Sequence, residues 1–248
     1  MTLFLESDKS FWHGFVDFYE PFFINKKINK IAEIGIFKGN SIRWLLDRFP
    51  NSVIYGADIL PLQKVWPIDK RFIFSQLDQG DRHLVANFLS QDLFDLIIED
   101  GSHVPSHQAL ALLEGVKRLN EGGLYILEDA HTSHRRYNTK SIGSFEYCGK
   151  QKGNALTVLL AIMHYKEIGV VIDQSKAQLI SEDSLFSKEE VMFLDENLKS
   201  INFYRRAKLP LKCYACGSVD FNFSSLRCTC GVDVFADADS MTFVLEKS

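Results

Sequence analysis

The feature that most constrains the fold is a regular alternation of short apolar runs with amphipathic stretches, which begins near residue 30. Such runs are typical of buried parallel strands, and the stretches between them of the helices that connect those strands. We predict strands at 31–35, 53–58, 72–75, 95–99 and 123–128, and helices at 39–48, 81–91, 105–120, 153–168 and 187–200. The alternation predicts a doubly wound α/β fold with helices on both faces of the sheet.

The two ends of the chain depart from this alternation. The segment before residue 30 contains the aromatic-rich run FWHGFVDFYEPFF, which favours an N-terminal arm packed on the domain. Near the other end, strand-like residues at 200–205 and 241–247 flank a stretch with four cysteines, as two strands of a terminal hairpin would flank an insertion. The predicted division is a main domain formed by 1–205 and completed by 240–248 as its last strand, with an insertion at 206–239.

Length and charge exclude several classes of protein. The 248 residues suffice for one large domain, or for one ordinary domain with a small module. The formal net charge is −4, so the chain lacks the basic character typical of proteins that bind phosphate backbones. No apolar run is long enough to span a bilayer, and the first ten residues do not resemble a signal peptide. We expect a cytoplasmic protein that binds neither nucleic acid nor a membrane.

The first predicted strand ends in a turn that carries two glycines. The run EIGIFKGN contains Glu33, Gly35 and Gly39. Glycines let the backbone approach a ligand closely, and ligands of open α/β sheets bind beyond the carboxyl ends of the strands. The spacing E-x-G-x-x-x-G differs from G-x-G-x-x-G, which counts against a dinucleotide and its pyrophosphate. The turn indicates a cofactor site, and the alternative is that the glycines serve a purely steric need.

Acidic residues follow the second and third predicted strands. Asp58 ends the second strand, at a place where a carboxylate accepts hydrogen bonds from both hydroxyls of a ribose. The alternative for Asp58 is a surface residue that caps a turn. The third strand runs into the polar loop QLDQGD, where Asp78 either binds an adenine amino group or caps the helix that begins near Asp81.

A cluster of carboxylates follows the fourth and fifth predicted strands, in IIEDGSH and YILEDAH. Neighbouring strands lie about 4.8 Å apart, so their ends bring Asp100, Glu128 and Asp129 to one rim. Uncompensated anions so placed repel one another, which raises their pKa values or recruits a cation. Oxygen ligands favour a hard divalent ion such as Mg²⁺ or Mn²⁺. The set predicts a metal site, against the alternative of helix caps and solvated loop residues.

A histidine lies three residues after the first of these carboxylates. The residue is His103. The ordinary pKa of a histidine side chain is near 6.5, which suits a general base. Because a single histidine is often only a structural hydrogen-bonding group, His103 stands out through its acidic neighbours. Its rivals as the base are His107, His131 and His134. The candidates for the substrate side are His13, His131, His134 and Arg135.

The four clustered cysteines form two short motifs. Cys213-x-x-Cys216-Gly and Cys228-x-Cys230-Gly resemble the paired knuckles of a zinc ribbon, in which four thiolates hold a structural Zn²⁺ ion. The second motif is C-x-C where C-x-x-C is usual, so free thiols are the alternative. A closed four-ligand site has no open position, which argues against a catalytic role. Cys148 stands apart and is expected to be a small buried or loop residue.

Five motifs together resemble a known family. The runs EIGIFKGNS, YGADI, QLDQGD, IIEDGSH and GGLYILED, in this order and spacing, resemble the metal-dependent sugar O-methyltransferases that tailor macrolide glycosides and bacterial surface sugars. The run SDKSFWHGFVDFYEPFF is similar to the arm of that family, which carries a Ser/Thr-Asp-Lys triplet and closes over the cofactor. The resemblance covers roughly 6–205 and 240–248, and the cysteine-bearing insertion departs from it.

The resemblance implies a role for each matched residue. The cofactor is S-adenosylmethionine (SAM), bound on a Rossmann-like sheet. The metal ligands are Asp100, Glu128 and Asp129, and the base is His103, with Asp100 also beside the reacting groups and the cofactor. The SAM contacts are Glu33, Gly35 and Gly39 at the methionine moiety, Asp58 at the ribose, and Asp78 and Gln79 at the adenine.

The expected activity is methylation of a sugar hydroxyl, on a nucleotide-linked sugar or a glycoside, by a homo-oligomeric enzyme. A metal that chelates two adjacent hydroxyls would lower their pKa, and His103 would take the proton. Two alternatives remain open. One is methylation of a non-sugar diol, and the other is a non-catalytic SAM-binding scaffold whose cysteine module binds a partner.

Overall fold

The computed structural model describes residues 7–134, 153–206, 209–235 and 240–248. The predictions for Arg135 and Cys148 therefore lie outside the described residues. Within the part of the chain that is described, no helix has both the length and the apolar character needed to cross a membrane.

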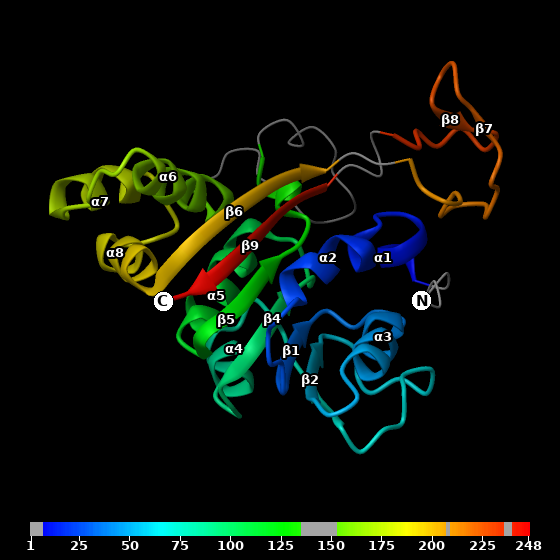
Figure 1. Cartoon of the computed structure of the whole chain (residues 1–248), viewed down its shortest axis with the longest axis horizontal. Coiled ribbons are helices and arrows are strands. Elements are labelled where there is room, and N and C mark those ends of the chain that lie inside the picture. Colours follow the sequence, from blue (N-terminus) through cyan, green and yellow to red (C-terminus); the bar gives the residue numbers. More distant parts are fainter. Residues whose placement is uncertain (1–6, 135–152, 207–208, 236–239) are drawn as a thin grey trace.

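A seven-stranded sheet forms the centre of the molecule, in the order β3-β2-β1-β4-β5-β9-β6 (Figure 1). The first five strands pair in parallel, whereas β9 runs antiparallel to both β5 and β6. The predicted doubly wound core, the neighbouring fourth and fifth strands and the terminal hairpin are confirmed. The strands are β1 (Lys30–Ile34), β2 (Val53–Asp58), β3 (Phe72–Gln76), β4 (Phe94–Glu99), β5 (Leu119–Leu127), β6 (Leu198–Arg206) and β9 (Ser240–Lys247).

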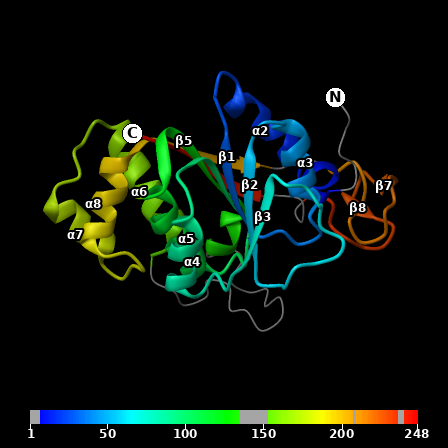
Figure 2. The ribbon, with the colours of Figure 1, turned by 90° about the horizontal axis from the view of Figure 1, so that it is seen from below.

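Helices cover both faces of this sheet, with α2 and α3 on one side and α4, α5 and α6 on the other (Figure 2). Successive strand residues point to opposite faces. Ile31 accordingly packs in the cluster that includes α2 and α3, whereas Ala32 packs in the cluster that includes α4, α5 and α6. The helices are α1 (Asp8–Phe11), α2 (Phe15–Phe23), α3 (Asn40–Arg48), α4 (Arg82–Leu89), α5 (Pro105–Val116), η1 (Ala130–Ser133, a 3₁₀ helix), α6 (Ala155–Glu167), α7 (Gln174–Ser181) and α8 (Lys188–Asn197).

Some element limits differ from those predicted. The helix predicted over 105–120 ends at Val116, because the chain enters β5 at Leu119 and Phe94 pairs with Leu119 across a register shift. The helix predicted over 187–200 ends at Asn197, since β6 begins directly after it. The helix α7 was not predicted.

The cysteine-bearing stretch 209–235, which we call the cysteine module, lies beside the N-terminal arm (Figure 1). Its regular structure is a two-stranded ladder of β7 (Phe221–Asn222) and β8 (Arg227–Cys228). It therefore lies outside the seven-stranded sheet, between β6 and β9 in the chain. The predicted division into two domains stays a prediction.

Candidate active site

The carboxyl ends of β1, β4 and β5 meet at one rim of the sheet. The Asp100 N–H donates to the Ile34 carbonyl at 2.9 Å, and the Glu128 N–H donates to the Glu99 carbonyl at 2.9 Å. These backbone bonds continue the strand pairing past the last ladder residues, so the acidic residues after β4 lie beside those after β5. The predicted convergence of polar strand ends is confirmed.

The glycine turn after β1 is shaped by its closeness to β4. Gly35 has a φ of +96°, and a Cβ there would lie 2.0 Å from the Asp100 carbonyl oxygen. Gly39 has a φ of +76° at the N-cap of α3, where a Cβ would lie 2.7 Å from the Trp66 ring. Both positions therefore require glycine for steric reasons. Gly35 also lines a cavity, and the predicted cofactor contacts of both glycines stay predictions.

Asp58 connects the second strand to this turn. One oxygen, Oδ2, accepts hydrogen bonds from the N–H groups of Ile36 and Phe37 at 2.8 and 2.9 Å, while Oδ1 accepts from the Leu60 N–H at 2.9 Å. The turn-capping alternative thus describes the contacts present in this structure. A ribose contact by Asp58 stays a prediction.

The structure shows which residue of the loop after β3 caps α4, a question that the sequence left open. Asp81, not Asp78, caps α4 by accepting from the N–H groups of His83 and Leu84. Asp78 instead accepts from the Gly80 N–H at 2.8 Å. The helix-cap alternative for Asp78 is therefore wrong, and its adenine contact stays a prediction.

Gln79 is almost fully buried, which the sequence did not indicate. Its Nε2 donates to Glu99 Oε1 at 2.6 Å, and its Oε1 accepts from the Ser102 N–H at 2.8 Å. The side chain thus holds the loop after β3 against the loop after β4. Burial raises the pKa of Glu99 to about 7.

Lys9, on the short helix α1 of the arm, reaches into the carboxylate cluster. Its Nζ lies 2.7 Å from Asp100 Oδ2, 2.5 Å from Glu128 Oε1 and 3.5 Å from Glu33 Oε1. Burial opposes the charge of Lys9, but the three carboxylates outweigh it and raise the pKa of the ammonium well above its ordinary value. Burial of Glu33 raises the pKa of its carboxyl group to about 7. The sequence showed the Ser-Asp-Lys triplet, yet we assigned Lys9 no contact.

This contact engages one oxygen of Glu128, and the predicted ligand set of Asp100, Glu128 and Asp129 stays a prediction. Glu128 Oε1 accepts hydrogen bonds from Lys9 and from the Tyr19 hydroxyl, so the arm holds that oxygen. At this rim, the ligand atoms that lie within 4.8 Å of one another belong to Asp100, His103 and Asp129. The buried ammonium of Lys9 attracts the Glu128 carboxylate toward the arm. Burial and the neighbouring Asp100 charge raise the pKa of Glu128 well above its ordinary value.

His103 lies between the two remaining carboxylates. Its Nε2 is 3.8 Å from Asp100 Oδ1 and 3.7 Å from Asp129 Oδ2. Burial would lower the pKa of His103, but the charges of Asp129 and Asp100 raise it. Burial would raise the pKa of Asp129, yet the charges of His103, His13 and His131 hold it well below its ordinary value. The imidazole is therefore positioned to accept a proton beside a carboxylate that stabilises the charged form.

Both sides of this pair have left-handed backbone. His103 has a φ of +55° and Asp129 a φ of +50°, values that cost energy in residues other than glycine. The Ser240 hydroxyl of β9 donates to Asp129 Oδ1 at 2.9 Å and helps to hold it. Such strain is common at functional sites, because the surrounding contacts must enforce it.

The structure places the rival histidines differently. His107 Nδ1 is hydrogen-bonded to the Ser102 hydroxyl at 2.9 Å, on the side of Gly80, and burial lowers its pKa. His131 Nδ1 lies 3.6 Å from Asp129 Oδ1, and His13 lines the same cavity as His103. His103 Nε2 approaches both Asp100 and Asp129, which places this imidazole between the two carboxylates.

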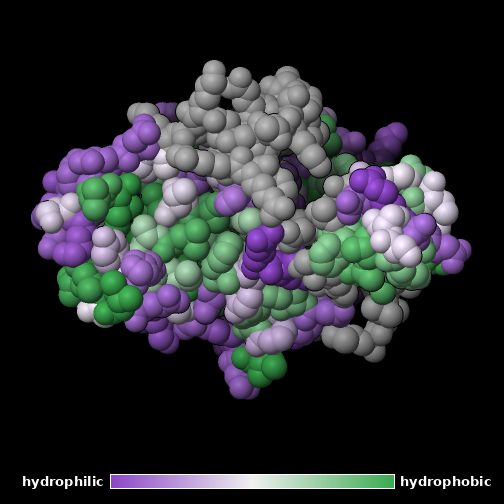
Figure 3. All heavy atoms as spheres, turned by 90° about the horizontal axis from the view of Figure 1, so that it is seen from above, coloured by the Kyte–Doolittle hydropathy of each residue, from purple (hydrophilic) through white to green (hydrophobic). Residues whose placement is uncertain are grey.

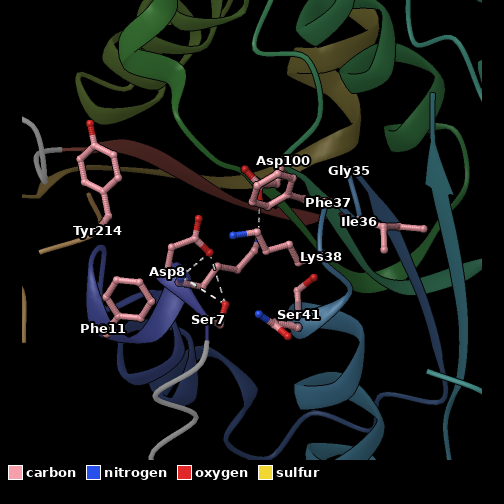
Figure 4. A pocket seen from close by; sticks show the side chains of 12 residues that line it. Ser7, Asp8, Phe11, Gly35, Ile36, Phe37, Lys38, Ser41, Asp100 and Tyr214 are labelled. Atoms are coloured by element: carbon pink, nitrogen blue, oxygen red, sulfur yellow. Dashed lines mark hydrogen bonds and ion pairs between the residues drawn. The ribbon is translucent and has the colours of Figure 1, made fainter. Parts of the chain in front are cut away.

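Two adjoining cavities meet at Asp100 and Lys9. The first, of about 270 Å³, lies between α1 and the glycine turn, with Phe11 and Tyr214 on the side away from Gly35 (Figure 4). The second, of about 240 Å³, is lined by the acidic residues and histidines of the rim. Its lining residues are Asp8, Lys9, His13, Phe15, Phe37, Asp100, Gly101, His103, Glu128 and Asp129.

The donor set of the second cavity suits a hard divalent ion. It offers carboxylate oxygens of Asp100 and Asp129 and an imidazole nitrogen of His103. Glu128 Oε2 is buried without a hydrogen-bond partner among the described residues. An unpartnered buried carboxylate oxygen is costly, which makes it available as a further ligand.

Two curated proteins are similar to this chain in sequence. An 8-demethyl-8-(2-methoxy-alpha-L-rhamnosyl)-tetracenomycin-C 3'-O-methyltransferase from Streptomyces olivaceus is 31% identical over 176 residues, which cover 65% of this chain and 43% of that protein. A mycinamicin VI 2''-O-methyltransferase from Micromonospora griseorubida is 30% identical over 135 residues, which cover 50% of this chain and 33% of that protein. The chain thus spans less than half the length of these relatives. No protein-family model matches it.

Solved structures show what class of fold this is. The MycE methyltransferase of the mycinamycin biosynthetic pathway, in complex with Mg and SAH, superposes with a TM-score of 0.59 and 19% identity, over 96% of this chain and 51% of that chain. Its complex that also contains mycinamycin VI gives a TM-score of 0.59 and 20% identity, over 96% of this chain and 50% of that chain. The chain therefore has the Rossmann-like fold of a methyltransferase.

Proposed function

We propose that this chain is a SAM-dependent, divalent-metal-assisted O-methyltransferase that acts on a sugar hydroxyl of a glycoside. The observation that carries the proposal is the arrangement of Asp100, His103 and Asp129 beside a cavity at the glycine turn. The two curated relatives are O-methyltransferases, one of them named for a rhamnosyl substrate, which supports this chemistry. The structure of MycE with Mg and SAH supports the pair of cofactors.

The first cavity would hold SAM. Gly35 and the backbone after it form one wall, and the arm forms the opposite wall. Glu33 lies near the end of β1 and is fully buried, with Oε1 3.5 Å from Lys9 Nζ. Lys9 therefore competes with a cationic ligand for the negative charge of Glu33. Asp58 ends β2, and Asp78 and Gln79 lie in the loop after β3; none of the three lines the first cavity. Their proposed ribose and adenine contacts would therefore lie beyond it.

The second cavity would hold the acceptor sugar and a divalent ion, Mg²⁺ or Mn²⁺, ligated by Asp100 and Asp129 together with Glu128 or His103. SAM supplies a methyl group already activated as a sulfonium, and the ion supplies positive charge that favours a deprotonated hydroxyl. Which of Glu128 and His103 joins the ligands decides whether the imidazole is free to act as a base.

His103 would take the hydroxyl proton on Nε2, which faces Asp100 and Asp129. The hydroxyl oxygen forms its new bond to the methyl carbon as the bond from that carbon to sulfur breaks, which leaves SAH. Asp129 stabilises the imidazolium that results, because its low pKa keeps it charged. Lys9 and Phe15 of the arm also line this cavity.

A second metal site completes the proposal. The sulfur atoms of Cys213, Cys216, Cys228 and Cys230 lie within 4.8 Å of one another. We propose that they hold a structural Zn²⁺ ion and that 206–239 form a module separate from the methyltransferase domain 1–205 and 240–248.

Transfer of labelled methyl from SAM tests the function. A rhamnosyl glycoside, a nucleotide-linked deoxysugar and a catechol serve as parallel acceptors. We expect transfer to the glycoside, loss of transfer with a chelator and recovery with Mg²⁺. Full transfer after chelation would disprove the metal role. Transfer to the catechol alone would favour the diol alternative, and SAH binding without transfer to any acceptor would favour a scaffold.

A further inference from the structure

The cysteine module packs directly on the N-terminal arm. Trp12, at the end of α1, is only 3% exposed, and it is buried in a cluster with the module residues Cys213, Cys228 and Val234. Two of the four candidate zinc ligands therefore contact the arm itself. The position of the arm therefore depends on whether Cys213 and Cys228 are held in place.

Three further contacts fix the relative position of α1 and the module. The Trp12 and Tyr214 rings meet edge to face with centroids 4.7 Å apart. The Leu211 N–H donates to the Phe11 carbonyl at 2.7 Å, and Lys212 Nζ lies 4.5 Å from the centroid of the Phe11 ring. Backbone, aromatic and cationic contacts thus all involve Phe11, the last residue of α1, or Trp12, which follows it.

The helix α1 also lines the proposed SAM cavity. Ser7, Asp8 and Lys9 line that cavity, and Tyr214 of the module lines it with them (Figure 4). The helix has only four residues, too few for a helix that is stable by itself. Its position over the cavity therefore depends on what it packs against, which includes the module.

The buried cluster of the module is small and includes Trp12 of the arm. Val219 and Phe223 are exposed, and apolar surface is visible over the module in Figure 3. The Sγ atoms of Cys213 and Cys230 are 3.6 Å apart, and those of Cys216 and Cys228 are 3.4 Å apart. These separations are too long for disulfides and near the sulfur–sulfur edge of about 3.8 Å that a tetrahedron with Zn–S bonds of about 2.3 Å would have. A module this small needs its metal to fold.

We infer that the cysteine module, folded around Zn²⁺, is a clamp that holds α1 closed over the SAM cavity and contributes Tyr214 to the cavity wall. Zinc occupancy then sets the affinity for SAM, although the zinc ion contacts no substrate. The inference rests on the proposed SAM and zinc sites. If loss of zinc leaves the arm closed only about a tenth of the time, the apparent dissociation constant rises about tenfold.

The test compares SAH binding with zinc content. Zinc per chain is measured by elemental analysis, SAH affinity by calorimetry, and hydrogen exchange at 8–13 by mass spectrometry. We expect one zinc per wild-type chain. The double variant Cys216→Ser/Cys230→Ser changes the two exposed ligands and should lose zinc, weaken SAH binding about tenfold and speed exchange at 8–13.

Two single variants separate the wall from the fold of the module. Tyr214→Ala should keep its zinc and weaken SAH binding by about fivefold. The matched control Phe223→Ala removes another exposed ring of the module that does not line the cavity, and it should change neither zinc content nor SAH affinity. This comparison remains informative if the double variant fails to fold.

The outcomes distinguish the clamp from the function on which it rests. Wild-type SAH affinity in the zinc-free double variant overturns the clamp and leaves the methyltransferase proposal intact. A wild-type chain that binds no zinc overturns the clamp and the proposed zinc site, and it leaves the methyltransferase proposal intact. A zinc-loaded wild-type chain that does not bind SAH overturns the proposed function, and the clamp with it.

Discussion

The carboxylate site and the cysteine module each gather side chains that can bind a metal, but they do so by different means. At the rim of the sheet, Asp100 and Asp129 follow buried strands, so the core positions them whether or not an ion is bound. In the module, Cys213 and Cys228 are themselves much of the buried material. A prebuilt site can leave positions open for substrate, whereas a site that must build its own fold needs all four ligands.

The variant with the largest expected effect replaces His103, the proposed general base of the carboxylate site, and it should affect turnover without affecting the cysteine module. His103→Ala should lower kcat by about 10²–10⁴-fold, because it removes the imidazole whose Nε2 lies near both Asp100 and Asp129. Zinc content and SAH affinity should stay at wild-type values. The matched control His107→Ala should retain turnover within a few-fold. Steady-state kinetics check both, and normal turnover in His103→Ala would contradict the assignment of the base.

The next effect tests the arm that joins the regions. Lys9→Met removes a buried cation and leaves Glu128 and Asp100 without their partner, which should cost about 3–5 kcal/mol of unfolding free energy. Urea denaturation measures the loss. Lys26→Met, which breaks a partly exposed pair with Glu246, serves as the control and should cost about 1 kcal/mol or less. Equal effects of the two variants would show that Lys9 is not a buried counter-ion.

A smaller effect separates the two metals. Asp129→Asn should raise the Mg²⁺ concentration for half-maximal activity by about 10–100-fold, because a neutral amide is a poorer ligand than a carboxylate. It should leave zinc content unchanged. Cys216→Ser should have the reverse pattern, with reduced zinc and an unchanged Mg²⁺ requirement. If each variant altered both metals, the sites would not be independent.

The smallest effect is expected at an ordinary surface pair, which gives a baseline for both regions. Asp92 accepts hydrogen bonds from Lys30 and Tyr55, and these bonds, against the effect of partial burial, lower its pKa. The pair therefore stabilises the fold at pH values above the ordinary carboxyl range, and that contribution is lost as pH falls through the lowered pKa. Asp92→Asn should cost about 0.2–1 kcal/mol at neutral pH and less in acid, by urea denaturation at both pH values.

Much of the fold could be predicted because the core strands carry strong local signals. Leu96, Ile97 and Ile98 form an unbroken apolar run in β4, which is typical of strands buried on both faces. The helix α7 carries no such signal, since Ala177 is its buried residue and the rest of QSKAQLIS is largely polar. Its place depends on packing against α8, which is a property of the tertiary structure.

The site could be predicted only as far as strand order determines it. Asp100 and Asp129 were brought together by the neighbouring ends of β4 and β5. Lys9 is 119 positions from Glu128 in the chain, and no periodicity connects the two. The same holds for Tyr214, which reaches the cavity through the packing of the module on Trp12. Contacts between separate elements decide which carboxylate meets the arm and which meets His103.

The hairpin of β6 and β9 is open at the end that carries the cysteine module, and this has a consequence for chain entropy. The strands pair from Arg206 with Ser240 onward, so all of the chain between these residues is a single loop. The entropic cost of closing a flexible loop grows only with the logarithm of its length, by about 0.6 kcal/mol for each doubling. A hairpin with a short turn could thus acquire a loop of this length with little loss of stability to the sheet. At the base of the loop, Arg206 donates to the carbonyls of His13 and Gly14, so any segment inserted there emerges next to the arm.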